Sequence, residues 1–191
     1  MGKVCLDPGH AGGSIDPGAV NKETGLQEAA INLSIANQVK KYLIAASYQV
    51  LMTRIEEEQV ETDSLEYRCE LINNWGAELI VSLHCNAAVN EEANGVEIYT
   101  TPGETAADRA AACIINQVIT TLPDLKLRAD WDDGDPDKEA NFYILRHTDA
   151  PAVLLEMAFI SNPKEAKKLA DSDWQREMAR AVARGISDYF S

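Results

Sequence analysis

The chain has 191 residues, of which 46% are hydrophobic and 25% charged, a composition typical of globular proteins that excludes collagen-like, low-complexity and membrane-bundle chains. The 17 lysines and arginines against 31 aspartates and glutamates leave a formal net charge of −14, which disfavours nucleic acid as a partner because phosphates attract basic proteins. At about 150 residues per domain, we expect one domain over residues 1–191.

The beginning of the chain shows no signal for export. Met1 leads directly into an apolar segment, without the basic start, apolar stretch and small-residue cleavage site of a signal peptide. No apolar run approaches the roughly 18 residues that indicate a membrane span. The four cysteines form no C-x-x-C pair, so we expect free thiols. We expect no membrane span, and any export signal must lie outside this chain.

Short apolar runs bounded by turn residues alternate with longer stretches of helical period, which is the pattern of an α/β sheet. In chain order, the expected strands are residues 4–7, 48–53, 79–83, 95–100 and 152–155, with a sixth at 142–145. Apolar residues at helical spacing predict four helices. The first helix contains Ala30, Leu33, Val39 and Leu43, and the second contains Leu65, Leu71 and Ile72. The third covers residues 110–119, and the fourth contains Trp174, Met178, Val182 and Ile186.

Residues 130–139 form one strongly biased segment, whose six acidic side chains indicate a surface loop. Asp133, Asp135 and Asp137 are spaced like the ligands of a calcium-binding loop. Lys138 and Ile144, however, stand where such a loop requires Gly and Glu. The spacing therefore argues against calcium binding.

Three histidines occur in the chain, and two of them follow predicted strands. His10 comes after the first strand, His84 caps the third, and Glu156 ends the fifth. Because the carboxyl ends of strands border the binding crevice of an open α/β sheet, we expect these side chains to converge on one site. The glycines near His10 do not match a nucleotide-binding loop, and no H-E-x-x-H helix occurs. A metal site must therefore combine distant segments.

The stretch from Glu23 to Glu28 can supply a carboxylate as the third ligand. Glu28 opens the first long helix, whose first turn returns to the sheet edge near His10, and Glu23 is the competing choice. Two histidines and one glutamate leave a fourth position open, which is the arrangement of catalytic zinc sites.

These residues belong to ordered motifs that resemble those of the zinc-dependent N-acetylmuramoyl-L-alanine amidases of the type-three family. The motifs are residues 7–10, Glu28 with Asn32 and Leu33, residues 82–86 and residues 151–162. The resemblance implies that His10, Glu28 and His84 are metal ligands and Glu156 the catalytic residue, which favours Glu28 over Glu23. Ala11, Cys85 and Ala158 depart from the usual family residues, and none of these departures removes a ligand.

The resemblance also implies a fold and a reaction. The fold is a single twisted sheet, mostly parallel or mixed, of about six strands flanked by helices on both faces. The reaction is hydrolysis of the amide between the lactyl group of N-acetylmuramic acid and the first L-alanine of the peptidoglycan stem peptide. One zinc ion per chain would polarise the scissile carbonyl and lower the pKa of its bound water toward about 7. Glu156 would act as general base and then as general acid.

The implied partner is peptidoglycan, and the implied place of action is the bacterial cell wall. We expect a monomer that reaches the wall by phage-type release or as a piece excised from a longer exported protein. The acidic loop at residues 130–139 is expected to border the substrate cleft and attract cationic groups of the stem peptide.

Two alternative functions remain: a zinc exopeptidase of similar fold and a non-catalytic wall-binding relative. An exopeptidase must recognise a terminal charge, for which the sequence offers no marker, and the presence of all four site residues argues against a non-catalytic relative. A cysteine hydrolase using Cys85 beside His84 is disfavoured because adjacent strand residues point to opposite faces.

Overall fold

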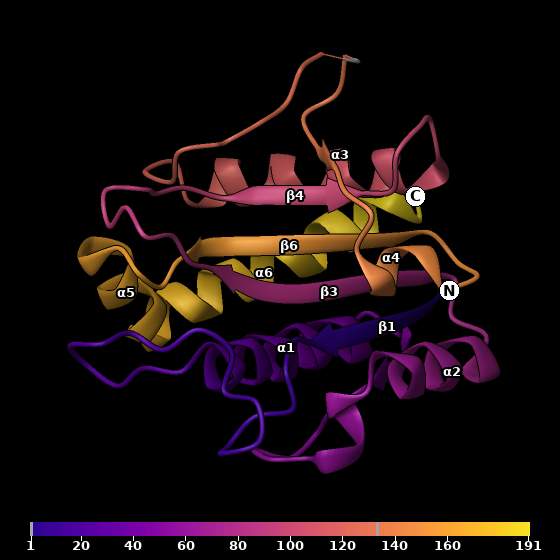
Figure 1. Ribbon diagram of the computed structural model, residues 1–191. Helices are drawn as coiled ribbons and strands as arrows, with labels where there is room; N and C mark the ends of the chain where they lie inside the picture. Colours follow the sequence, from indigo (N-terminus) through magenta and orange to yellow (C-terminus); the bar gives the residue numbers. More distant parts are fainter. Residues whose placement is uncertain (1, 133) are drawn as a thin grey trace.

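The computed structural model describes residues 2–132 and 134–191, and its centre is a six-stranded sheet with the order β2-β1-β3-β6-β4-β5 (Figure 1). The strands are β1 (Lys3–Pro8), β2 (Gln49–Met52), β3 (Leu79–Asn86), β4 (Glu97–Thr100), β5 (Lys138–Glu139) and β6 (Ala152–Phe159). Neighbouring strands are parallel except β4 and β6, which are antiparallel. The expected mixed α/β sheet is confirmed.

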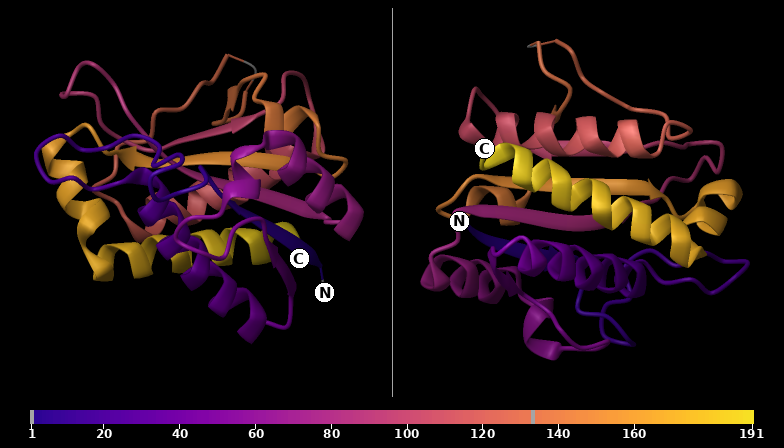
Figure 2. Two further views of the ribbon diagram at one scale, coloured as in Figure 1. Left: turned by 60° about the horizontal axis from the view of Figure 1, so that its bottom comes forward. Right: turned by 180° about the vertical axis from the view of Figure 1, so that it is seen from behind.

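Helices cover both faces of this sheet. The helices are α1 (Glu28–Ala45), α2 (Leu65–Trp75), α3 (Ala106–Thr121), α4 (Tyr143–Arg146), α5 (Pro163–Ala170) and α6 (Ser172–Tyr189), with a 3₁₀ turn η1 (Val60–Asp63). Helices α1, α3, α5 and α6 share the larger hydrophobic core with one face, and Figure 2 shows α6 crossing that face in the view from behind. Helices α2 and α4 share a smaller core with the opposite face.

Alternation along the strands decides which face each side chain occupies. On β3, Leu79, Val81 and Leu83 lie in the larger core, whereas Ile80 lies in the smaller one. His84 is four residues after Ile80 on the same strand, so its side chain lies on the same face, the one that α2 and α4 cover in part. This smaller core covers only part of its face, which leaves the sheet open beyond α2 and α4.

Local sequence signals explain where several helices begin. Thr105 and Asp108 form a capping box at the start of α3, which satisfies backbone N–H groups that have no partner inside the helix. The side chain of Asn162 caps α5, and Asp171 caps α6 in the same way. No described helix is long and apolar enough to cross a membrane.

The structure corrects three details of the expected elements. Residues 142–145, expected as a strand, mostly belong to the short helix α4, and the sixth strand is β5. A short apolar run does not distinguish a strand from a buried helical turn, and here the turn packs Ile144 and Leu145 against α2 and β6. Ala30 and Leu65, expected on buried helix faces, are exposed.

Candidate metal centre and catalytic pocket

Strand pairing brings His84 and Glu156 side by side. They are register partners on the parallel strands β3 and β6, and Glu97 on β4 is the partner of Glu156 on its other side. His84 and Glu156 were expected at strand ends, but β3 continues to Asn86 and β6 to Phe159. All three side chains therefore form a row across the sheet, held by continuous strands.

His10 approaches this row from the loop after β1. Its backbone has a left-handed φ of 68°, a conformation uncommon for residues other than glycine. Asp16 holds the ring in place, with 2.7 Å between its Oδ2 and Nδ1 of His10. The neighbouring Gly9 leaves room for His84, because a Cβ at this position would lie 2.2 Å from the His84 ring. Asp16 was missed in the sequence, where a lone acid in a loop gives no signal.

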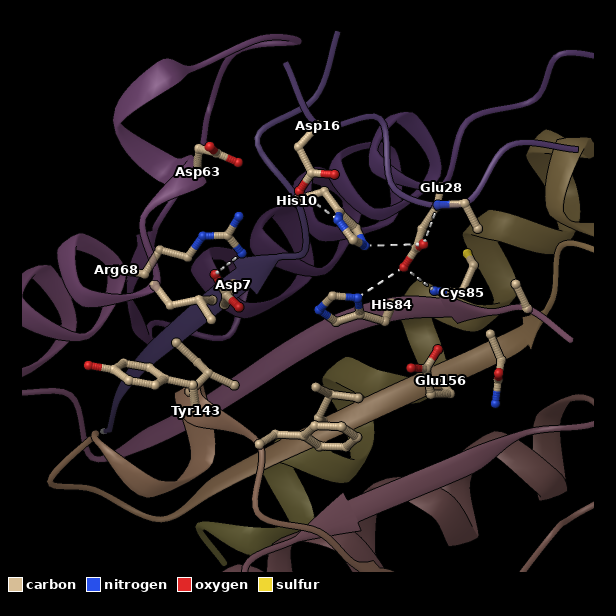
Figure 3. A pocket seen from close by; sticks show the side chains of 17 residues that line it. Asp7, His10, Asp16, Glu28, Asp63, Arg68, His84, Cys85, Tyr143 and Glu156 are labelled. Atoms are coloured by element: carbon tan, nitrogen blue, oxygen red, sulfur yellow. Dashed lines mark hydrogen bonds and ion pairs between the residues drawn. The ribbon is translucent and has the colours of Figure 1, made fainter. Parts of the chain in front are cut away.

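Glu28 bridges the two histidines from the first turn of α1. Its Oε2 lies 3.2 Å from Nε2 of His10, and its Oε1 lies 2.9 Å from Nδ1 of His84 (Figure 3). The backbone N–H groups of Ala19 and Cys85 donate to the same carboxylate. These contacts place the carboxylate edge between both imidazole rings.

The three side chains can hold a metal ion. One ligand atom from each of His10, Glu28 and His84 lies within 4.8 Å of the other two. Two imidazole nitrogens and one carboxylate oxygen form a donor set suited to zinc. Gly18 keeps the backbone close, since a Cβ there would lie within 2.8 Å of both His10 and Glu28. Glu23, the competing ligand, is exposed and lies outside this group.

Electrostatics within the group favour a cation. Burial alone lowers the pKa of His10, but hydrogen bonds and charge interactions with Glu28 and Asp16 raise it to about 8. Burial raises the pKa of Glu28, but the two histidines outweigh it and hold this pKa well below its usual range. The carboxylate is therefore ionised between two rings, as a metal ligand must be.

Glu156 lies beside this group with one oxygen unsatisfied. Its Oε2 is buried and has no hydrogen-bond partner among the described residues. Burial raises its pKa to about 7, with a contribution from the charges of Glu28 and Glu97 that His84 partly offsets. A carboxyl group with this pKa can take up and release a proton near neutral pH.

Glu97 carries a second carboxylate next to Glu156, and it was not singled out for a role from the sequence. The side chains of Asn86 and Tyr99 donate to its Oε2, and those of Arg128 and Lys138 to its Oε1. These donors outweigh burial and lower the pKa of Glu97. Glu97 therefore stays ionised, whereas Glu156 titrates.

A pocket of about 490 Å³ joins these groups and extends toward α2 and α4. Besides the metal group and Glu156, its lining includes Asp7, Asp63, Arg68 and Tyr143 (Figure 3). No described residue of the acidic segment 130–139 lines this pocket, and Asp133 lies outside the described residues. That the loop borders the substrate cleft stays a prediction.

The structure buries the side chain of Cys85. Its thiol is buried among α1 and β3, and Sγ lies 3.5 Å from Oδ1 of Asn32. Burial raises the pKa of this thiol far above its ordinary value, with smaller contributions from Glu28 and Glu156. Since the thiolate is the reactive form, Cys85 is a packed residue of the core.

Comparisons with known proteins show which family and which folds this chain resembles. The model of a family described as N-acetylmuramoyl-L-alanine amidase matches residues 4–188. The amidase CwlM of Bacillus licheniformis is 33% identical over 191 residues, which are 100% of this chain and 70% of that protein. The amidase AmiC2 of Nostoc punctiforme is 30% identical with a TM-score of 0.87, over 98% of this chain and 96% of that one. The CwlD amidase of Clostridioides difficile, solved in complex with the GerS lipoprotein, is 28% identical with a TM-score of 0.88, over 100% and 98%.

Proposed function

The chain belongs to the N-acetylmuramoyl-L-alanine amidase family, and from this premise we propose that it is a zinc-dependent enzyme of the bacterial cell wall. It cleaves the amide between the lactyl group of N-acetylmuramic acid and the first L-alanine of the stem peptide. The observation that carries the proposal is the convergence of His10, Glu28 and His84 beside Glu156 in one pocket. The family match favours this reaction over the exopeptidase alternative.

His10, Glu28 and His84 would hold one zinc ion per chain. When bound, zinc supplies Lewis acidity that polarises the scissile carbonyl and lowers the pKa of water. Asp16 fixes the ring of His10 through Nδ1, which leaves Nε2 directed at Glu28. A carboxylate behind a ligating histidine is a common arrangement that orients the ring and raises its basicity.

Glu156 would move the proton. With a pKa near 7, it accepts a proton from the attacking water and then donates it to the departing nitrogen of L-alanine. Glu97 stays ionised beside it and does not compete for this role. Because every proposed ligand and Glu156 come from one chain, a monomer of residues 1–191 would contain the complete site.

Product analysis tests the proposal. Digestion of purified peptidoglycan should release peptides with new L-alanine amino termini and leave the glycan strands uncut. A chelator should abolish the release of these peptides, and added zinc should restore their release. New reducing sugar ends without free alanine amines, or full activity in chelator, would contradict the proposal.

A further inference from the structure

The pocket has a second charged end that the proposed reaction does not use. Asp7 on β1 is 1% exposed and accepts hydrogen bonds from Oγ1 of Thr53 at 2.6 Å and from Oγ of Ser82 at 2.7 Å. Nη1 of Arg68 on α2 lies 3.4 Å from the same carboxylate. Asp7 is thus already satisfied on both oxygens, and its charge holds the Arg68 guanidinium in position.

Arg68 retains unused donors that face the pocket. The side chain is 3% exposed, and its Nε donates to the carbonyl of Thr62 at 2.5 Å. A guanidinium has five N–H donors, of which these contacts occupy two, and Nη2 has no protein partner among the described residues. In Figure 3 the guanidinium points into the space that the pocket residues enclose.

Charge makes this position distinct within the pocket. Among the described lining residues, Arg68 is the single lysine or arginine, whereas five are acidic: Asp7, Asp16, Glu28, Asp63 and Glu156. A carboxylate of a bound molecule is repelled by most of this lining. Outside the three residues of the metal group, His10, Glu28 and His84, Arg68 offers the positive charge that can attract such a carboxylate. A planar guanidinium can bind a carboxylate through two parallel hydrogen bonds.

The sheet sets the distance along β3 between His84 and the position beside Asp7, the carboxylate that holds Arg68. Asp7 is the register partner of Ser82, and His84 lies two residues further along β3 on the same face, which is about 6.6 Å along the strand. Since an extended peptide spans about 3.3 to 3.6 Å per residue, this separation corresponds to roughly two residues of substrate.

We propose that Arg68 is a specificity-determining residue that binds a carboxylate on the second residue of the stem peptide. The inference rests on the proposed amidase function. On the sugar side, the lactyl carboxyl is consumed in the scissile amide, so the nearest free carboxylate of the substrate lies on the peptide side. The stem peptide therefore runs from the metal group toward α2, and the glycan leaves in the opposite direction.

A matched pair of substrates tests this assignment without altering the protein. Two soluble muramyl peptides are compared that differ only in a free carboxylate or a carboxamide on the second residue. For the zinc-loaded wild type, kcat/KM should favour the carboxylate by about tenfold to hundredfold, the effect of losing one charged hydrogen-bonded partner. Equal kcat/KM values for the two peptides would overturn the role of Arg68 and leave the amidase function standing. Cleavage of neither would overturn both.

Variants separate recognition from structural support. Arg68→Gln should reduce the ratio of the two kcat/KM values to about one, by lowering only the value for the carboxylate peptide. Arg68→Lys should give an intermediate ratio, because lysine keeps the positive charge but lacks the two parallel N–H donors of the guanidinium. Arg109→Gln, which removes a surface arginine bonded to the carbonyl of Tyr189, is the control and should keep the wild-type ratio. A folded Arg68→Gln protein that retains the wild-type ratio would overturn the proposal.

Discussion

Glu156 and Glu97 occupy paired positions on β6 and β4, yet their pKa values are shifted in opposite directions. Glu97 accepts hydrogen bonds from four side chains that outweigh its burial and lower its pKa. Glu156 lacks a partner for Oε2, and burial raises its pKa to about 7. Neighbouring carboxylates with separated pKa values can take different roles in one site, which supports Glu156 as the proton carrier.

Substitutions should separate the proposed metal ligands from the proposed proton carrier. His10→Ala should lose both bound zinc and activity. Glu156→Gln should keep about one zinc per chain but lose activity by about 10²- to 10⁴-fold, because an amide cannot carry a proton at neutral pH. Metal analysis and product release measure the two effects, with His147→Ala, an exposed histidine, as the control. Loss of zinc from Glu156→Gln, or wild-type turnover, would contradict these roles.

The raised pKa of Glu156 also predicts a pH dependence of stability. Below about pH 4.5 the carboxyl is protonated in both folded and unfolded chains, so it has no effect on their balance. Between pH 4.5 and its folded pKa of about 7, the unfolded chain releases the proton first, so the free energy of unfolding falls as pH rises, by up to about 3 kcal/mol.

Urea denaturation of chelator-treated protein measures this effect. Glu156→Gln lacks the titrating group, so its free energy of unfolding relative to wild type should rise between pH 4.5 and pH 7.5. The exposed Glu104→Gln serves as the control. A stability difference between Glu156→Gln and wild type that is equal at both pH values would show that the burial of Glu156 imposes no such cost.

Arg54 ties together the segments that carry two of the proposed ligands. It is 0% exposed and donates to the carbonyls of Gly9, His10 and Ala29, and to those of Glu56 and Glu57. Burial lowers its pKa to about 10, with a smaller effect of the nearby Arg68. The guanidinium thereby fixes the left-handed His10 loop against the start of α1, where Glu28 lies.

Arg54→Lys should therefore weaken zinc binding. The donors of a guanidinium lie at several edges of one plane, and one ammonium cannot reach carbonyls at all of these edges. His10 and Glu28 would then no longer be held at a fixed spacing. We expect zinc affinity to fall by about tenfold or more, since one lost hydrogen bond to a charged group costs about 1.5 kcal/mol or more. Competition with a chelator gives the affinity, circular dichroism checks the fold, and Arg109→Lys is the control. Wild-type affinity in folded Arg54→Lys would show that Arg54 does not position the ligands.

Among the elements, α3 and α6 make a close contact through a glycine. A Cβ at Gly185 would lie 2.4 Å from the Cα of Ile114, so the two helix backbones approach closely there. Alanine is the better helix former by about 1 kcal/mol, but the clash is with backbone, which cannot move aside without displacing a helix.

Gly185→Ala should therefore destabilise the protein by about 1 to 3 kcal/mol, the usual cost of overpacking a core. Urea denaturation measures the change. The adjacent exposed Arg184→Ala should stay within about 0.5 kcal/mol of wild type. A Gly185→Ala protein as stable as wild type would show that the helices can separate at little cost.

At the scale of the whole molecule, the two faces of the sheet differ in what covers them. Long helices bury one face continuously, and this core supports the strands from behind. The small core under α2 and α4 covers only part of the other face, so polar side chains near the carboxyl ends of β1, β3 and β6 line a pocket there. A rigid, parallel-strand scaffold can thus hold ligands from distant segments at fixed positions.

Apolar periodicity in the sequence is enough to predict the α/β class, five of the six strands and four long helices, because this periodicity is a local property. The candidate residues of the site come from ordered motifs through the family resemblance. Residue patterns alone predict a strand at residues 142–145 and give Asp16, Arg54 and Glu97 no role. The fold instead forms α4 at Tyr143–Arg146, brings Glu28 to both histidines as the resemblance implied, and places Asp16, Arg54 and Glu97 around the site. Those outcomes depend on strand register and on contacts between residues far apart in the chain, which packing sets and no short pattern encodes.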